Sequence, residues 1–237
     1  MRLSLILGTM ILLQCPLLAQ YPQTNQQRKW EFSFLLGVNS AGDTSSLTPV
    51  SGETTPRLVG LEHASGYLVG VRITENLGDR FGAELEYNFA NQPMVFVNLS
   101  PALPHLDLDH RAHSLDYNIL YYLTPANSKL RPYAVGGIGT SYYQIDGNSR
   151  DFAVAQGLDL KNRWKLAGTW GGGVKYYLGN QWGIRFDVRD QITGVPDYGL
   201  PHTASSFQGV AGAAFRPDGL MHTWQFSAGF LVVWNGS

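Results

Sequence analysis

The sequence predicts an all-β protein, an eight-stranded antiparallel up-and-down transmembrane β-barrel. Two observations predict it: long segments in which apolar and polar residues alternate, and connections that alternate between short and long. A strand points successive side chains to opposite faces, so a period of two indicates one apolar and one polar face. The segment 164–192 shows the pattern twice, around the tight-turn pair Gly179-Asn180. Its strands reach about ten residues, the length that crosses a bilayer at a tilt of roughly 45°.

Eight segments follow the alternation, and the glycine-rich fifth one leaves its facing open: 30–38, 66–74, 81–90, 113–123, 133–144, 164–178, 182–192 and 221–234. The expected long connections are 39–65, 91–111, 145–163 and 193–220, and the short ones are 75–80, 124–132 and 179–181. Bacterial outer-membrane barrels have an even strand number, short periplasmic turns and long external loops. Because an open sheet edge in lipid costs several kcal/mol per unpaired group, we expect the first segment to pair with the last.

The apolar face can point either to lipid or, as in a lipocalin, into the barrel. Glycines on the polar face suit a narrow lumen better than a water-facing surface. Aromatic side chains gather towards the strand ends, where girdles lie at the lipid interface. We therefore expect the apolar face to point outward, with an aromatic girdle of Trp30, Phe81, Phe89, Tyr121, Trp164, Tyr176, Trp182, Trp224 and Trp234.

The polar face carries charges of both signs. Buried charges need partners, and neighbouring strands can supply them. A selective pore would favour one sign, so the balanced set predicts an ion-pair network that plugs the lumen. Its expected members are Glu31, Arg72, Glu84, Glu86, Asp116, Lys165, Lys175, Arg185, Asp187 and Arg189.

The N-terminus reads as a secretory signal, with Arg2 before an apolar core at 3–13. We expect cleavage after Ala19 or Gln20, so that 1–19 is the signal peptide and 20–237 a single barrel domain; a retained anchor helix is the alternative. Cys15, the only cysteine, then leaves with the leader. Loss of Arg2 leaves 16 basic residues against the 18 acidic ones, which argues against a nucleic-acid-binding surface.

No catalytic or metal-binding pattern emerges. The densest histidine cluster, LDLDHRAH at 106–113, fits no standard zinc spacing. His113 and Ser114 point to opposite faces of one strand, and His202 with Ser205 or Ser206 has only Asp197 as a nearby acid. We therefore expect no enzyme activity, no cofactor and no bound metal.

Three segments resemble the small outer-membrane β-barrel superfamily, which includes OmpA-like transmembrane domains, OmpX and opacity-type proteins. They are RPYAVGGIGTSYY at 131–143, GGGVKYYLGNQWGIRFDVRD at 171–190 and WQFSAGFLVVW at 224–234. The resemblance implies a barrel inserted by the outer-membrane assembly machinery of a Gram-negative-type bacterium. The chain departs from the family in that Asn235-Gly236-Ser237 follow the last aromatic residue, which normally serves as the assembly signal.

These observations lead to three functional hypotheses. The first is a non-enzymatic, monomeric barrel in outer-membrane lipid, with a structural role or an external ligand bound by its loops. The second is a narrow porin-like transport barrel for small or hydrophobic solutes. The third is a lipid-modifying outer-membrane enzyme. The loops at 39–65 and 193–220 carry no recognisable binding signature.

Overall fold

The computed structural model describes residues 28–51, 54–204 and 213–234 of the chain. The predicted signal peptide, and with it the start of the barrel domain, lies outside the described residues. Within these ranges, no helix is both long enough and apolar enough to cross a membrane.

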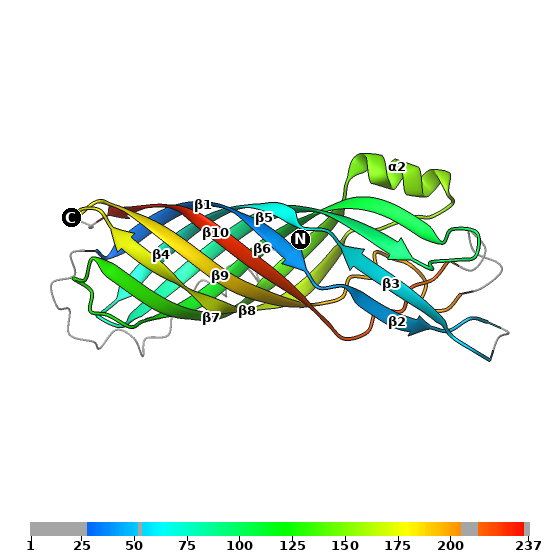
Figure 1. Cartoon of the computed structure of the whole chain (residues 1–237), viewed down its shortest axis with the longest axis horizontal. Coiled ribbons are helices and arrows are strands. Elements are labelled where there is room, and N and C mark those ends of the chain that lie inside the picture. Colours follow the sequence, from blue (N-terminus) through cyan, green and yellow to red (C-terminus); the bar gives the residue numbers. More distant parts are fainter. Residues whose placement is uncertain (1–27, 52–53, 205–212, 235–237) are drawn as a thin grey trace, which may run out of the picture.

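Eight strands form a closed antiparallel barrel (Figure 1): β1 (Trp30–Ala41), β4 (Gly66–Leu77), β5 (Phe81–Val97), β6 (His105–Tyr122), β7 (Leu130–Ile145), β8 (Arg163–Tyr177), β9 (Trp182–Gly194) and β10 (Leu220–Trp234). Each pairs with its neighbour along the chain, and β1 pairs with β10 from Trp30↔Trp234 to Ala41↔Thr223. The predicted fold class, strand number and closing pair are therefore confirmed.

The external end is more structured than the sequence predicts. The connection 39–65 contains a hairpin of β2 (Thr44–Thr48) and β3 (Arg57–His63), and β3 pairs with the far end of β5. The connection 145–163 contains the helix α2 (Gly147–Ala155), which Figure 1 shows outside the barrel wall. The hairpin, α2 and the longer connections lie at one end of the molecule, and the C-terminal end of β10 lies at the other.

The prediction of a long loop at 91–111 is wrong. β5 has 17 residues and β6 has 18, and only residues 98–104 connect them. The alternation continues in both strands, because Met94 and Phe96 of β5 and Leu106 and Leu108 of β6 all point inward and are buried. The barrel therefore extends well beyond the strand length that a bilayer requires.

Burial settles which face of the sheet points outward. Phe32 is 48% exposed and Phe226 is also 48% exposed, whereas Glu84 and Arg185 are each 0% exposed. A water-soluble barrel would show the opposite distribution. The apolar face therefore contacts lipid and the polar face fills the lumen, as in outer-membrane barrels.

All nine residues of the predicted girdle lie on this outer face, seven of them at least 41% exposed and the other two, Trp30 and Phe89, partly buried. Phe81 and Tyr121 pack at the periplasmic end with ring centroids 5.4 Å apart, and Tyr142 packs on Trp164 towards the external end at 4.7 Å. Their role at the lipid interface stays a prediction.

Candidate functional site

The middle of the lumen holds a charge network, which we define as Arg72, Glu84, Glu86, Arg185, Asp187 and Arg189. All six side chains are fully buried. Arg189 reaches Glu84 at 2.7 Å and also contacts Glu86, while Arg185 reaches Glu84 at 2.9 Å. Because β5 and β9 are four strands apart in either direction round the barrel, these contacts cross its full width.

Asp187 joins the three cations of the network. It lies 2.7 Å from Arg72, 2.9 Å from Arg185 and 3.0 Å from Arg189. Tyr133 adds its hydroxyl, which accepts a hydrogen bond from Arg185 at 2.6 Å and donates to Asp187. Three cations and three anions thus satisfy one another in a place where an unpaired charge would be costly.

A second cluster closes the periplasmic end of the lumen around Glu31. This carboxylate accepts hydrogen bonds from Lys175 at 2.5 Å, from Tyr177 at 2.5 Å and from Asn76 at 2.8 Å. Lys175 also donates to the Tyr122 hydroxyl at 2.9 Å. Neighbouring strands were expected to supply the partners of the inward charges, but Lys175 lies three strands away from Glu31 round the barrel.

Two arginines that were not among the predicted interior residues complete this end. The guanidinium of Arg131 lies 3.5 Å from the ring centroid of Tyr122, and that of Arg28 lies 3.8 Å from the ring of Tyr177. Arg28 also donates to the backbone oxygen of Ser128 at 2.9 Å, and so holds the periplasmic turn against the lumen. A buried cation over an aromatic face is stabilised by the ring quadrupole.

Asp116 and Lys165 of the predicted set stand apart from both clusters. Asp116 is buried, but no cation of the described residues lies within 4.0 Å of it; it accepts hydrogen bonds from Gln191 at 3.1 Å and Thr169 at 3.3 Å. Lys165 is partly exposed and makes no ion pair within the described part of the chain. The structure therefore pairs four of the five predicted cations with four of the five anions.

Glycines on neighbouring strands make room for the inward polar side chains. A Cβ on Gly139 would lie 2.4 Å from Oδ1 of Asp116 and 2.2 Å from the backbone oxygen of Leu115. A Cβ on Gly137 would lie 2.1 Å from Oδ1 of Asn118. Each glycine sits directly opposite its polar partner in the β6–β7 register. The side chains of β6 can therefore lie flat against the wall of a narrow lumen.

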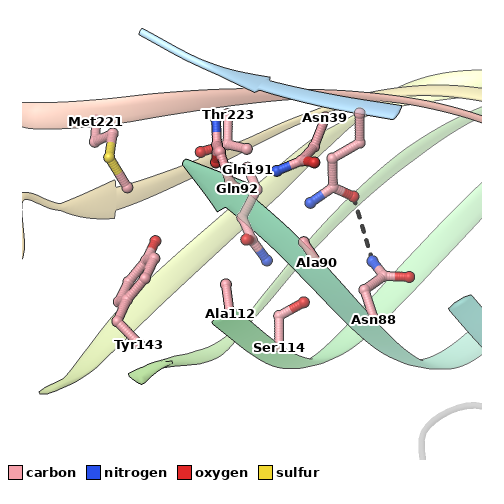
Figure 2. Close-up of a pocket in the computed structure, with 11 residues that line it drawn as sticks. Asn39, Asn88, Ala90, Gln92, Ala112, Ser114, Tyr143, Gln191, Met221 and Thr223 are labelled. Carbon is pink, nitrogen blue, oxygen red and sulfur yellow. Dashed lines mark hydrogen bonds between the residues drawn. The ribbon is translucent and has the colours of Figure 1, made fainter. Parts of the chain in front are cut away.

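A small polar chamber lies on the external side of the charge network. Figure 2 shows Asn39, Gln92, Ser114 and Gln191 among the residues around it, with the hydrogen bond of 3.2 Å from Asn88 to Gln225 along one wall. The chamber has a volume of about 20 Å³, enough for one water molecule.

An apolar core closes the external end above this chamber. It joins inward residues of the extended strands to residues of the loops, and Phe96 packs on Phe215 and Tyr198 with ring centroids 5.4 and 6.2 Å away. Next to the core residue Tyr198, Asp197 of the connection after β9 accepts a hydrogen bond from Arg163. Partial burial raises the pKa of Asp197, but its hydrogen bonds from Arg163 and Gly199 outweigh burial and place the pKa below its ordinary value.

An ionisable pair, Asp190 and His222, lies on the outer face of the wall. Asp190 of β9 points outward yet is 1% exposed, because it is covered by its neighbours. Its Oδ2 lies 2.7 Å from Nδ1 of His222 and accepts a hydrogen bond from Trp170 Nε1 at 3.1 Å. Ser40 of β1 lies on the same outer face. It is opposite Trp224, which is two residues after His222 in β10. An ionisable pair on a membrane-facing surface is a candidate functional site by default.

Within the described residues, neither His113 nor His202 contacts a serine of the candidate catalytic pairs. His202 lies 3.3 Å from Asp197, and Ser205 and Ser206 lie outside the described residues. Ser114 is buried in the lumen, whereas His113 points outward and contacts the Tyr87 hydroxyl at 2.8 Å. Over the described ranges, no three histidine, cysteine or acidic residues gather in a way that could hold a metal.

Comparison with known proteins supports the architecture. Residues 10–230 match the model of the outer membrane protein beta-barrel domain family. The structure of OprG from Pseudomonas aeruginosa superposes with a TM-score of 0.60 at 18% identity, over 91% of this chain and 100% of that one. Outer membrane protein W of E. coli is 20% identical over 89% of this chain and 100% of its own, with a TM-score of 0.36. No curated protein matches the sequence.

Proposed function

The chain belongs to the outer membrane protein beta-barrel domain family, and we propose that it is a closed, non-enzymatic barrel that acts through its external end. Family and fold place it in the outer membrane of a Gram-negative bacterium. Its role is structural or is a surface interaction made by the β2–β3 hairpin, α2 and the external connections. It works as a monomer in outer-membrane lipid after insertion by the assembly machinery.

The observation that carries this proposal is the set of contacts between β5 and β9. Arg189 and Arg185 reach Glu84 and Glu86 across the full width of the lumen. An eight-stranded barrel has an interior that side chains can fill. Because the three cations and three anions of the charge network cancel, the middle of the lumen offers no excess of one sign to a passing ion. The lumen is therefore plugged rather than selective.

Planar-bilayer recordings of the refolded protein test the plug. We expect no steady conductance from the wild type. The double variant R185A/R189A removes both cations that cross the lumen and is expected to produce brief or steady current. A large, steady conductance of the wild-type protein would contradict the proposal.

Transport of small or hydrophobic solutes is the second candidate. The observation that favours it is the change of the interior from polar to apolar towards the external end, from the polar chamber to the apolar core. Liposome-swelling or uptake assays distinguish the two functions, because a transport barrel accelerates solute entry while a plugged barrel leaves it unchanged.

A lipid-modifying enzyme is the third candidate, and the lipid-facing pair of Asp190 and His222 favours it. A histidine held by a carboxylate through Nδ1 can act as a general base through Nε2, and Ser40 offers a hydroxyl on the same face. Mass spectra of lipid A from cells with the wild type, with H222Q and without the protein decide this case. Identical spectra from all three exclude it.

A further inference from the structure

Two histidines from distant parts of the sequence meet beneath the external hairpin. His63 is the last residue of β3, and His110 lies in β6 with its side chain turned into the barrel. Their ring centroids are 5.8 Å apart and their planes are inclined by 79°. His110 is 1% exposed. The pair therefore lies inside the external extension of the barrel rather than on its surface.

The nitrogens of this pair lack proper partners. Both ring nitrogens of His63 and Nδ1 of His110 are buried with no hydrogen bond of good geometry among the described residues. An unsatisfied buried polar group destabilises the fold, and native proteins leave few of them. Because a neutral imidazole carries one N–H and one nitrogen lone pair, the two rings bring two lone pairs together, which points to a ligand that binds nitrogen.

The separation of the two rings fits a shared ion. An imidazole nitrogen lies about 1.1 Å from its ring centroid and a metal–nitrogen bond is about 2.0 Å long, so two imidazoles on one ion have centroids about 5 to 6 Å apart. The observed 5.8 Å corresponds to a wide angle at the metal. Such an angle is typical of low coordination numbers rather than of tetrahedral zinc.

A thioether lies on the same face. Met94 of β5 is the direct cross-strand partner of His63 and is 1% exposed. Directly opposite residues of an antiparallel pair have Cβ atoms about 4.5–5.5 Å apart. Around His110 the neighbours are aromatic, with the rings of Tyr143 and Tyr198 at 5.9 and 6.3 Å. Soft sulfur and imidazole ligands in apolar surroundings select Cu(I) over ions that prefer oxygen.

We propose that His63, His110 and Met94 form a binding site for a single Cu(I) ion inside the external end of the barrel. The site joins β3, β5 and β6, so the ion links the external hairpin to the barrel wall. Of the histidine cluster at 106–113 the site uses only His110, because His113 faces the opposite side of β6.

The test uses the tag-free, full barrel refolded in detergent, with Cu(I) competed against bicinchoninate under argon. The wild type is expected to bind one equivalent. H63Q and H110Q are expected to bind at least tenfold more weakly, and M94L about tenfold more weakly. H105Q and H202Q, which change exposed histidines, serve as matched controls and are expected to bind as the wild type does. Gel mobility with and without heating checks that each variant is folded.

A second measurement needs no variant. X-ray absorption of the copper-loaded wild type is expected to show two nitrogen ligands at about 2.0 Å and one sulfur at about 2.3 Å. Equal Cu(I) uptake by the wild type and a folded H63Q/H110Q variant would overturn the proposal. So would a spectrum without two nitrogen ligands, or binding of Zn²⁺ in preference to Cu(I).

Discussion

Replacing Arg189 with methionine tests the charge network most directly. Arg189 lies 2.7 Å from Glu84 and 3.0 Å from Asp187, and it also contacts Glu86. Methionine retains much of the volume but removes the cation, which leaves three buried carboxylates facing only Arg72 and Arg185. Breaking a buried ion pair by removing one partner costs about 3–5 kcal/mol. We expect R189M to lose a free energy of unfolding in this range.

Urea unfolding in lipid vesicles, followed by tryptophan fluorescence and by gel mobility with and without heating, measures the loss. K165M is the matched control, because Lys165 is an inward-register lysine that forms no ion pair in the described part of the chain, and its loss should stay below about 0.5 kcal/mol. The double variant R189M/E86Q should recover part of the stability, because it removes the surplus negative charge. A loss below about 1 kcal/mol for R189M would refute the reasoning.

Three further predictions concern other parts of the barrel. G139A is expected to destabilise by about 1–3 kcal/mol because its methyl group would overlap a neighbouring strand, whereas G168A, with nothing within 4 Å, is the matched control; equal urea midpoints would contradict this. F96A is expected to cost about 3–5 kcal/mol in the external core, seen as faster proteolysis of the external connections while the barrel stays folded. The pKa of Asp197 lies below its ordinary value, so its ionised carboxylate stabilises the folded external connections. This stabilisation is full above about pH 4 and is lost as pH falls through the lowered pKa. D197N should remove that pH dependence from proteolysis of the same connections.

The strands within the bilayer were predictable because lipid and lumen impose opposite chemistry on alternate residues. Every inward carboxylate and every girdle aromatic of the prediction lies on the expected face. The pairing was not predictable to the same degree. Lys175 meets Glu31 across the lumen, and Asp116 has no cation beside it. Such contacts depend on barrel diameter and strand stagger, which periodicity along one strand does not contain.

The interior residues that the sequence analysis missed have two causes. Tyr122, Tyr133 and Tyr177 serve as hydrogen-bonding groups in the lumen, but tyrosine also belongs in lipid-facing girdles, so its type alone does not indicate a face. Arg131 lies in the predicted connection 124–132, but β7 already begins at Leu130. The register would have found it, because Arg131 lies directly opposite the inward Lys175.

The missed extension of β5 and β6 has a physical reason that also locates the membrane boundary. Near the periplasmic end of β6, Leu115 and Tyr117 point outward while Asp116 points inward. On the external side of His110 the side chains still alternate between the two faces. The apolar residues there are on the inner face instead, since Leu106 and Leu108 are buried inside. Such an exchange is expected where the outer face passes from lipid into water, because the apolar core must then lie inside. One strand therefore serves two cores of opposite arrangement. The chamber and the histidine pair lie where the two cores meet, and their polar groups face neither lipid nor bulk water.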